Sequence, residues 1–129
     1  MTNVEVVHSV YTKLENRPGT LDRAAKVLGA KQMNIDAISL ETSGNNAYAR
    51  FLTHKPREAV EVLKSNGIDA YESQMVVTTL SNRPGELARA TAELAAAGLN
   101  IEGILTTPEG RLAFRTNDIE RTAQILRKL

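Results

Sequence analysis

Stretches rich in β-branched residues and stretches with helical spacing alternate along the chain. Residues 6–14 and 74–80 favour strands, and each run stops at an Asn-Arg-Pro-Gly turn. Pro18 and Pro84 suit the first turn of a helix, where a missing N–H costs little. Beyond each turn, mainly apolar positions recur at helical spacing, at Leu21, Ala25 and Leu28 and again at Leu87, Thr91 and Leu94. The pattern therefore predicts a strand followed by a helix in two places.

A hairpin and a second helix are expected after each first helix. The predicted hairpins pair residues 34–41 with 46–53 and residues 100–107 with 110–115. The second helices are expected over residues 56–66 and 117–129, the latter opening with a capping box of Asn117 and Glu120. Gly98 suits a left-handed cap at the end of the helix that begins near Pro84. Gln32 stands at the same place after the helix that begins near Pro18, so that helix ends less favourably.

The repeated element order reflects a duplication within the sequence. Residues 16–38 align without gaps on residues 82–104, at an offset of 66 residues. The repeat units are therefore residues 1–66 and 67–129. A domain of about 65 residues buries only about 60% of its surface and is marginally stable alone. The two halves are expected to depend on each other. The identical positions in the first copy are Asn16, Arg17, Pro18, Gly19, Leu21, Arg23, Ala24, Leu28, Asn34, Ile35 and Ile38.

The repeat register also predicts where the last strand of each half lies. Residues 68–73 follow the second helix of the first half, but the second helix of the second half runs to Leu129. Residues 1–7 align with residues 67–73, and residues 2–7 alternate in a β-prone pattern. We expect residues 2–7 to complete the second half; the alternative is a frayed terminus. The predicted domains are residues 1–73 and residues 74–129.

Composition narrows the class of protein. The 129 residues are 42% hydrophobic and 24% charged, which suits one compact folded unit and no multidomain enzyme. Sixteen Lys and Arg oppose fifteen Asp and Glu, so the net charge of +1 attracts neither nucleic acid nor an anionic membrane. The lack of cysteine and of a signal peptide leads us to expect a cytoplasmic protein.

Catalytic, metal and cofactor motifs are not found in the sequence. His8 and His54 are the only histidines, and neither has metal-ligand spacing to a second ligand. Gly-rich phosphate loops and a Gly-x-Ser-x-Gly elbow are missing too. Tyr48 and Phe51 are three residues apart, so they face opposite sides of a strand and do not make an RNA-binding platform. We expect no enzyme activity, no metal and no cofactor.

The motif pair Asn-Arg-Pro-Gly-x-Leu and Asn-Ile-Asp or Asn-Ile-Glu, present in both halves, resembles the ACT domain. The resemblance covers nearly the whole chain twice. It implies an α+β fold of two tandem ferredoxin-like domains (βαββαβ) with antiparallel sheets, pairing side by side. It also implies a small effector, usually an amino acid, bound where domains pair. We expect a homodimer, because an open face or edge of such a sheet must be covered.

The Asn-Arg-Pro-Gly loops can be interpreted chemically without the family. The glycine leaves backbone N–H groups at the helix start open to a carboxylate. Asparagine side chains from this loop, and others before the second strand of a neighbouring domain, could hold the rest of an amino acid. Alternatively, these asparagines only cap helices and shape turns. The candidate ligand-binding residues are Asn16, Arg17, Pro18, Gly19, Asn34 and Ile35, with Asn82, Arg83, Pro84, Gly85, Asn100 and Ile101 in the second copy.

Two regulatory functions fit these expectations. In the first, the chain is a free-standing amino-acid sensor that passes effector binding to a partner enzyme or regulator. In the second, it is a permanent regulatory subunit of an amino-acid biosynthetic enzyme, similar to the small subunit of acetolactate synthase. The NI-x-S-L-like run of that subunit is echoed by residues 34–40. We favour the sensor, because that echo fails in the second copy at residues 103–105.

Overall fold

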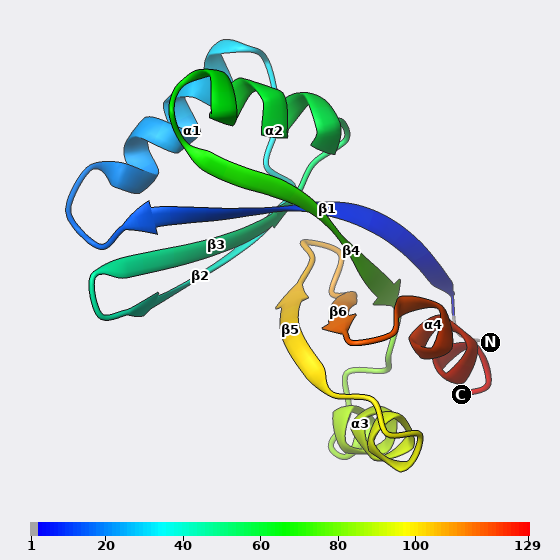
Figure 1. The fold of residues 1–129 in the computed structure, drawn as a ribbon. Helices are drawn as coiled ribbons and strands as arrows, with labels where there is room; N and C mark the ends of the chain where they lie inside the picture. The colour runs from blue at the N-terminus through cyan, green and yellow to red at the C-terminus, as the bar shows by residue number, and fades with distance from the viewer. Residues whose placement is uncertain (1–2) are drawn as a thin grey trace. The chain divides into compact units, whose positions relative to one another are not determined.

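The computed structural model describes residues 3–129, which divide into two compact units (Figure 1). One unit is His8–Ser73, and the other combines Gln74–Leu129 with the chain up to Val7. Strands β1 (Val4–Glu15) and β4 (Asp69–Thr78) each contribute to both units. The chain therefore enters and leaves the unit His8–Ser73 within a strand rather than through a loop.

The unit His8–Ser73 is a ferredoxin-like domain. Its strands are hydrogen-bonded in the order β2-β3-β1-β4, with β2 at Ala37–Ser43 and β3 at Asn46–Leu52. Helices α1 (Thr20–Ala30) and α2 (Pro56–Ser65) cover one face of this sheet (Figure 1). Alternate residues of the strands point toward these helices. The core between them contains Val10, Leu14, Ala24, Leu28, Phe51, Ala59 and Leu63.

The second unit has the same strand order, β5-β6-β4-β1. Its elements are α3 (Glu86–Ala96), β5 (Ile101–Thr106), β6 (Leu112–Thr116) and α4 (Ile119–Arg127). Residues 4–7 of β1 take the place of the fourth strand, and Val4 packs against the core. Thr2, where we expected this strand to begin, lies outside the described residues. The core contains Val76, Ala90, Leu94, Leu99, Phe114, Ala123 and Leu126.

Arg111 anchors the N-terminal strand in the second unit. Its guanidinium donates to the carboxylate of Glu5 at 2.6 Å and to the carbonyl oxygen of Asn3 at 3.2 Å. The same guanidinium also donates to the hydroxyl of Thr79 at 3.2 Å. Arg111, on the hairpin of β5 and β6, therefore links the N-terminal residues of the chain to the segment that follows β4.

Several predicted boundaries need correction. Pro18 and Pro84 precede their helices, because Gly19 and Gly85 are the N-caps and have left-handed φ angles of 91° and 89°. Asp118 caps α4, contrary to the prediction of Asn117; its carboxylate accepts the N–H of Arg121 at 3.1 Å. The side-chain oxygen of Asn117 instead accepts the N–H of Asn100 at 2.8 Å.

Other boundaries depend on whether the chain has a residue that favours a turn at that point. The predicted strands over residues 68–73 and 74–80 form the single strand β4, because no Gly or Pro interrupts them. The predicted difference between the first-helix ends is confirmed: Gly98 has φ 76°, and Gln32 takes up φ 60° without being glycine. Among the described residues, no helix is long and apolar enough to cross a membrane.

Candidate functional site

The site begins at the loop between β1 and α1. The backbone N–H of Arg23 donates to the carbonyl oxygen of Gly19 at 3.0 Å, which closes the first helical turn. Gly19 accepts its left-handed φ of 91° because it has no Cβ. The hydroxyl of Thr20 donates to the carbonyl oxygens of Glu15 and Arg17 at 2.7 and 3.2 Å. These bonds hold the loop in one shape at the start of the helix.

A cavity of about 430 Å³ lies against this loop. Buried Leu14 and Ile68 supply apolar surface on its wall. Three of the predicted ligand-binding residues line the cavity, namely Arg17, Pro18 and Gly19. It is also lined by the start of β4 and the end of β1, which the loop motif alone does not include. The remaining lining residues are Lys13, Glu15, Thr20, Arg23, Asn46, Gly67 and Asp69.

Charges of both signs line this cavity. Lys13, Arg17 and Arg23 are cationic, and Glu15 and Asp69 are anionic. The Arg17 guanidinium forms a hydrogen-bonded ion pair with the Glu15 carboxylate and thereby lowers the pKa of Glu15. The Arg23 guanidinium contacts the carbonyl oxygen of Asn66, beside the cavity wall at Gly67. Cations, carboxylates and helix-start N–H groups together match a zwitterion, which carries one charge of each sign.

Asn16 serves the loop rather than the cavity. Its side-chain amide donates to the carbonyl oxygen of Gly44 at 3.0 Å, and its backbone N–H donates to the carbonyl oxygen of Asn45 at 2.9 Å. Both bonds connect the loop to the hairpin of β2 and β3. Asn16 is not among the residues that line the cavity.

Asn34 and Ile35 lie at the other end of the sheet. They precede β2, whose first residue, Ala37, is opposite Leu52, whereas the loop after β1 adjoins Asn46. The side-chain amide of Asn34 donates to the carboxylate of Asp36 at 2.7 Å. Asn34 and Ile35 are therefore apart from the cavity within this domain, and their role in completing a site from a neighbouring domain stays a prediction.

The corresponding loop of the second unit repeats the Asn-Arg-Pro-Gly residues, but the residue after the glycine differs. Gly85 has φ 89°, and the N–H of Arg89 donates to its carbonyl oxygen at 2.9 Å. Glu86 follows Gly85, and its two carboxylate oxygens accept from Arg83 and Arg89, each at 3.0 Å. The bond from Arg89, followed by that from Arg83, lowers the pKa of Glu86.

Comparison with known proteins agrees with this duplicated architecture. A sequence model of the family described as the ACT domain pair matches residues 5–129. The chain belongs to the ACT domain pair family. No curated protein matches it.

Solved structures share the fold of this ACT pair. A protein from Bacteroides thetaiotaomicron superposes with a TM-score of 0.86 at 23% identity, over 97% of this chain and 89% of that one. The ligand-free regulatory subunit of aspartate kinase from Thermus thermophilus has a TM-score of 0.73 at 19% identity, over 98% and 95% of the two chains. Aspartokinase III from E. coli, in complex with aspartate and ADP, has a TM-score of 0.61 at 15% identity, over 97% of this chain and 31% of that chain.

The loop motif does not include the cavity residues of the ACT pair that come from other elements. Lys13 lies on β1, two residues before the strand ends at Glu15, and Asp69 begins β4, 50 residues beyond Gly19 in the sequence. Only the tertiary fold brings them together. The sequence did contain a signal that Arg23 matters for the site, because Arg23 recurs as Arg89 in the repeat alignment. The folded structure thus places cationic and anionic side chains beside a loop for which the motif indicated mainly backbone groups and asparagines.

Proposed function

We propose that this ACT pair is a regulatory protein that binds a small effector of the amino-acid class in the cavity beside Gly19. The observation that carries the proposal is the mixed charge of that cavity. Arg17 and Arg23 and the first N–H groups of α1 suit the effector's carboxylate, while Asp69 suits its ammonium. A regulatory role agrees with membership of the ACT family and needs no catalytic residues in the chain.

The activity of a partner enzyme would depend on whether the effector is bound. The regulatory subunit of aspartate kinase from Thermus thermophilus matches this chain over nearly its whole length, which supports a separate regulatory chain acting on an enzyme. A free-standing sensor and a permanent subunit both use this cavity, and they differ in whether the partner stays bound without effector. The cytoplasmic location stays a prediction from the sequence.

A thermal-shift screen against the twenty amino acids tests the proposal. A ligand present at 100 times its dissociation constant adds about 2.7 kcal/mol of stability, which for a chain of this length raises Tm by roughly 10 °C. Replacing the carboxylate in Asp69→Asn should reduce that shift, because the ammonium then has a weaker partner. Asp22→Asn is the matched control, since Asp22 pairs with Lys26 on α1 away from the cavity. The proposal fails if no amino acid raises Tm.

We further propose that two chains form a homodimer through the open sheet face of the unit His8–Ser73. The three tyrosines of the chain meet there: the ring of Tyr11 lies 6.1 Å from that of Tyr48 and 5.1 Å from that of Tyr71. Arg50 stacks over Tyr11 at 4.7 Å. Tyr71 is 54% exposed, and Tyr and Arg are enriched in protein interfaces.

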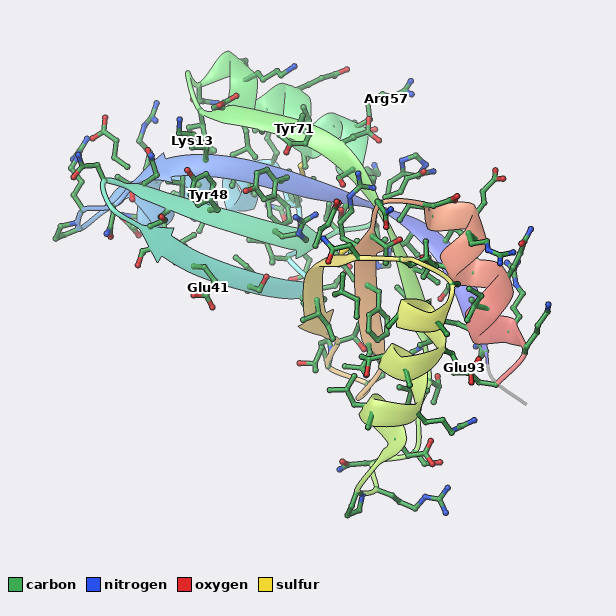
Figure 2. The ribbon with its side chains drawn as sticks, turned by 60° about the horizontal axis from the view of Figure 1, so that its bottom comes forward. Lys13, Glu41, Tyr48, Arg57, Tyr71 and Glu93 are labelled. Carbon is green, nitrogen blue, oxygen red and sulfur yellow. The ribbon has the colours of Figure 1, made fainter. Side chains whose placement is uncertain are left out.

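Charge complementarity supports a second copy as the occupant of this face. Glu41 and Lys13 are both directly opposite Tyr48, one on each neighbouring strand, so the three side chains form one row across the sheet. Figure 2 labels Lys13, Tyr48 and Glu41 on successive strands. A twofold axis parallel to β3 above Tyr48 would place Glu41 over Lys13 of the partner, twice.

Light scattering on charge variants tests this dimer. Glu41→Lys should weaken it by about 5- to 30-fold, because two surface pairs of about 0.5–1 kcal/mol each become repulsive. Lys13→Glu with Glu41→Lys reverses both signs and should restore the parent affinity. A parent protein that stays at the 14.1 kDa mass of one chain would overturn the homodimer, and a double variant as weak as Glu41→Lys would overturn the pairing.

A further inference from the structure

The two Asn-Arg-Pro-Gly loops have nearly the same backbone but differ at the first residue of the helix. Gly19 has φ 91° and ψ −11°, and Gly85 has φ 89° and ψ −11°. Thr20 and Glu86 follow these glycines and begin α1 and α3. Because the preceding backbone is the same, their Cβ atoms occupy corresponding places in the two domains.

The side chains at these two places make different contacts. Thr20 folds back onto carbonyl oxygens of its own loop and lines the open cavity. Glu86 instead extends between two arginines, with one carboxylate oxygen 3.0 Å from Arg83 and the other 3.0 Å from Arg89. Its side chain is only 15% exposed.

The arginines that Glu86 engages are the ones the cavity uses in the first copy. Arg83 corresponds to Arg17 and Arg89 to Arg23 in the gapless repeat alignment. In the first copy both positions line the cavity. There Arg17 pairs with the carboxylate of Glu15, and Arg23 contacts only a carbonyl oxygen. In the second copy both guanidinium groups bind the single carboxylate of Glu86.

We propose that Glu86 is a built-in anion that closes the second loop, so that the ACT pair binds one effector per chain, at the first loop. This inference rests on the proposed function of the first cavity. A ligand carboxylate could enter the second loop only by displacing Glu86 from both arginines. That carboxylate is covalently attached beside its partners and needs no loss of translational freedom to bind.

The electrostatics of the loop keep this anion in place at neutral pH. A carboxylate in the first turn of a helix is favoured by the partial positive charge of the helix start. The hydrogen bond from Arg89 lowers the pKa of Glu86, so the side chain stays ionised below the ordinary titration range of a glutamate. Charge-assisted pairs with both oxygens engaged are stronger than single neutral hydrogen bonds.

A reciprocal exchange between the two loops tests the proposal by calorimetry. The probe is the amino acid that gives the largest thermal shift in the screen. The parent protein should bind one equivalent. Glu86→Thr, which installs the first-copy residue, should bind two, and Glu86→Gln, which keeps the shape but removes the charge, should also admit a second equivalent. Thr20→Glu should weaken binding by about 10- to 100-fold, as expected for a competing charge-assisted pair.

A second measurement keeps this inference separate from the proposed function. Carbon-detected NMR of the carboxyl groups should show Glu86 titrating below the ordinary range of a glutamate, because its carboxylate accepts from Arg89 and Arg83. Titration of Glu86 in the ordinary range of a glutamate would overturn the built-in anion whether or not any amino acid binds. Two equivalents bound by the parent, or a single equivalent bound by both Glu86 variants, would overturn it as well. Loss of all binding with a low Glu86 midpoint would count against the proposed function alone.

Discussion

A protein that lacks residues 1–7 is expected to unfold roughly 10 °C below the parent and to aggregate. The deletion removes Val4 from the core of the second unit and both N-terminal acceptors of Arg111, the carboxylate of Glu5 and the carbonyl oxygen of Asn3. It also exposes an edge of β4 that β1 otherwise covers. Together these losses amount to about 3 kcal/mol. Differential scanning calorimetry and light scattering measure both effects.

Point substitutions in the same strand separate packing from chain length. Val4 is half-buried and packs against the core, whereas Val6 is 40% exposed. Val4→Asn should therefore lower Tm clearly, and Val6→Asn should change it little. A truncated protein that stays soluble and melts at the parent temperature would show that the N-terminal strand does not stabilise the second unit. It would also favour residues 74–129 as an independent folding domain.

Phe114→Ala is expected to cost about 3–5 kcal/mol, because it empties the centre of the second core. Phe114 is fully buried and lies opposite Val76 in the sheet. Its other neighbour, Ile104, is directly opposite on β5 but is 41% exposed. Ile104→Ala is therefore a matched control on the same row of the sheet, with an expected cost below about 1 kcal/mol. Urea denaturation gives both values.

The first unit repeats this contrast and supplies a second test of the duplication. Phe51 is 2% exposed and lies opposite Val10, while Ile38 lies opposite Phe51 and is 43% exposed. Phe51→Ala should thus be as costly as Phe114→Ala, and Ile38→Ala as mild as Ile104→Ala. Equal costs for the buried and the exposed member of either row would contradict the assignment of the two cores.

The duplicated fold was predictable because its signals are local and occur twice. Strand and helix patterns on both sides of each Asn-Arg-Pro-Gly loop predicted the βαββα order, and the repeat register predicted the N-terminal strand. Helix starts were predicted less well. Proline tolerates the first helical turn but does not require it, and the left-handed glycine after it moved the start to Thr20. At α4, neighbouring Asn117 and Asp118 are both good caps, and only the contact of Asn117 with Asn100 decides between them.

The candidate site was predictable only in its loop. Arg17, Pro18 and Gly19 line the cavity, but Lys13, Arg23 and Asp69 come from β1, α1 and β4 and meet only after folding. The contrast between Thr20 and Glu86 was visible in the alignment as one mismatch among matched positions. Its meaning depends on where the two neighbouring arginines point, which sequence spacing does not give.

The position of a bound effector, measured by amide chemical shifts in ¹⁵N-labelled protein, tests the proposed effector site most directly. The amino acid with the largest thermal shift is titrated into the protein at neutral pH. We expect the largest changes on the amides of residues 17, 19 and 20 at the start of α1 and residues 67–69 at the start of β4, which line one cavity. Changes confined to other parts of the chain, or no change at these amides at saturation, would contradict the proposed site.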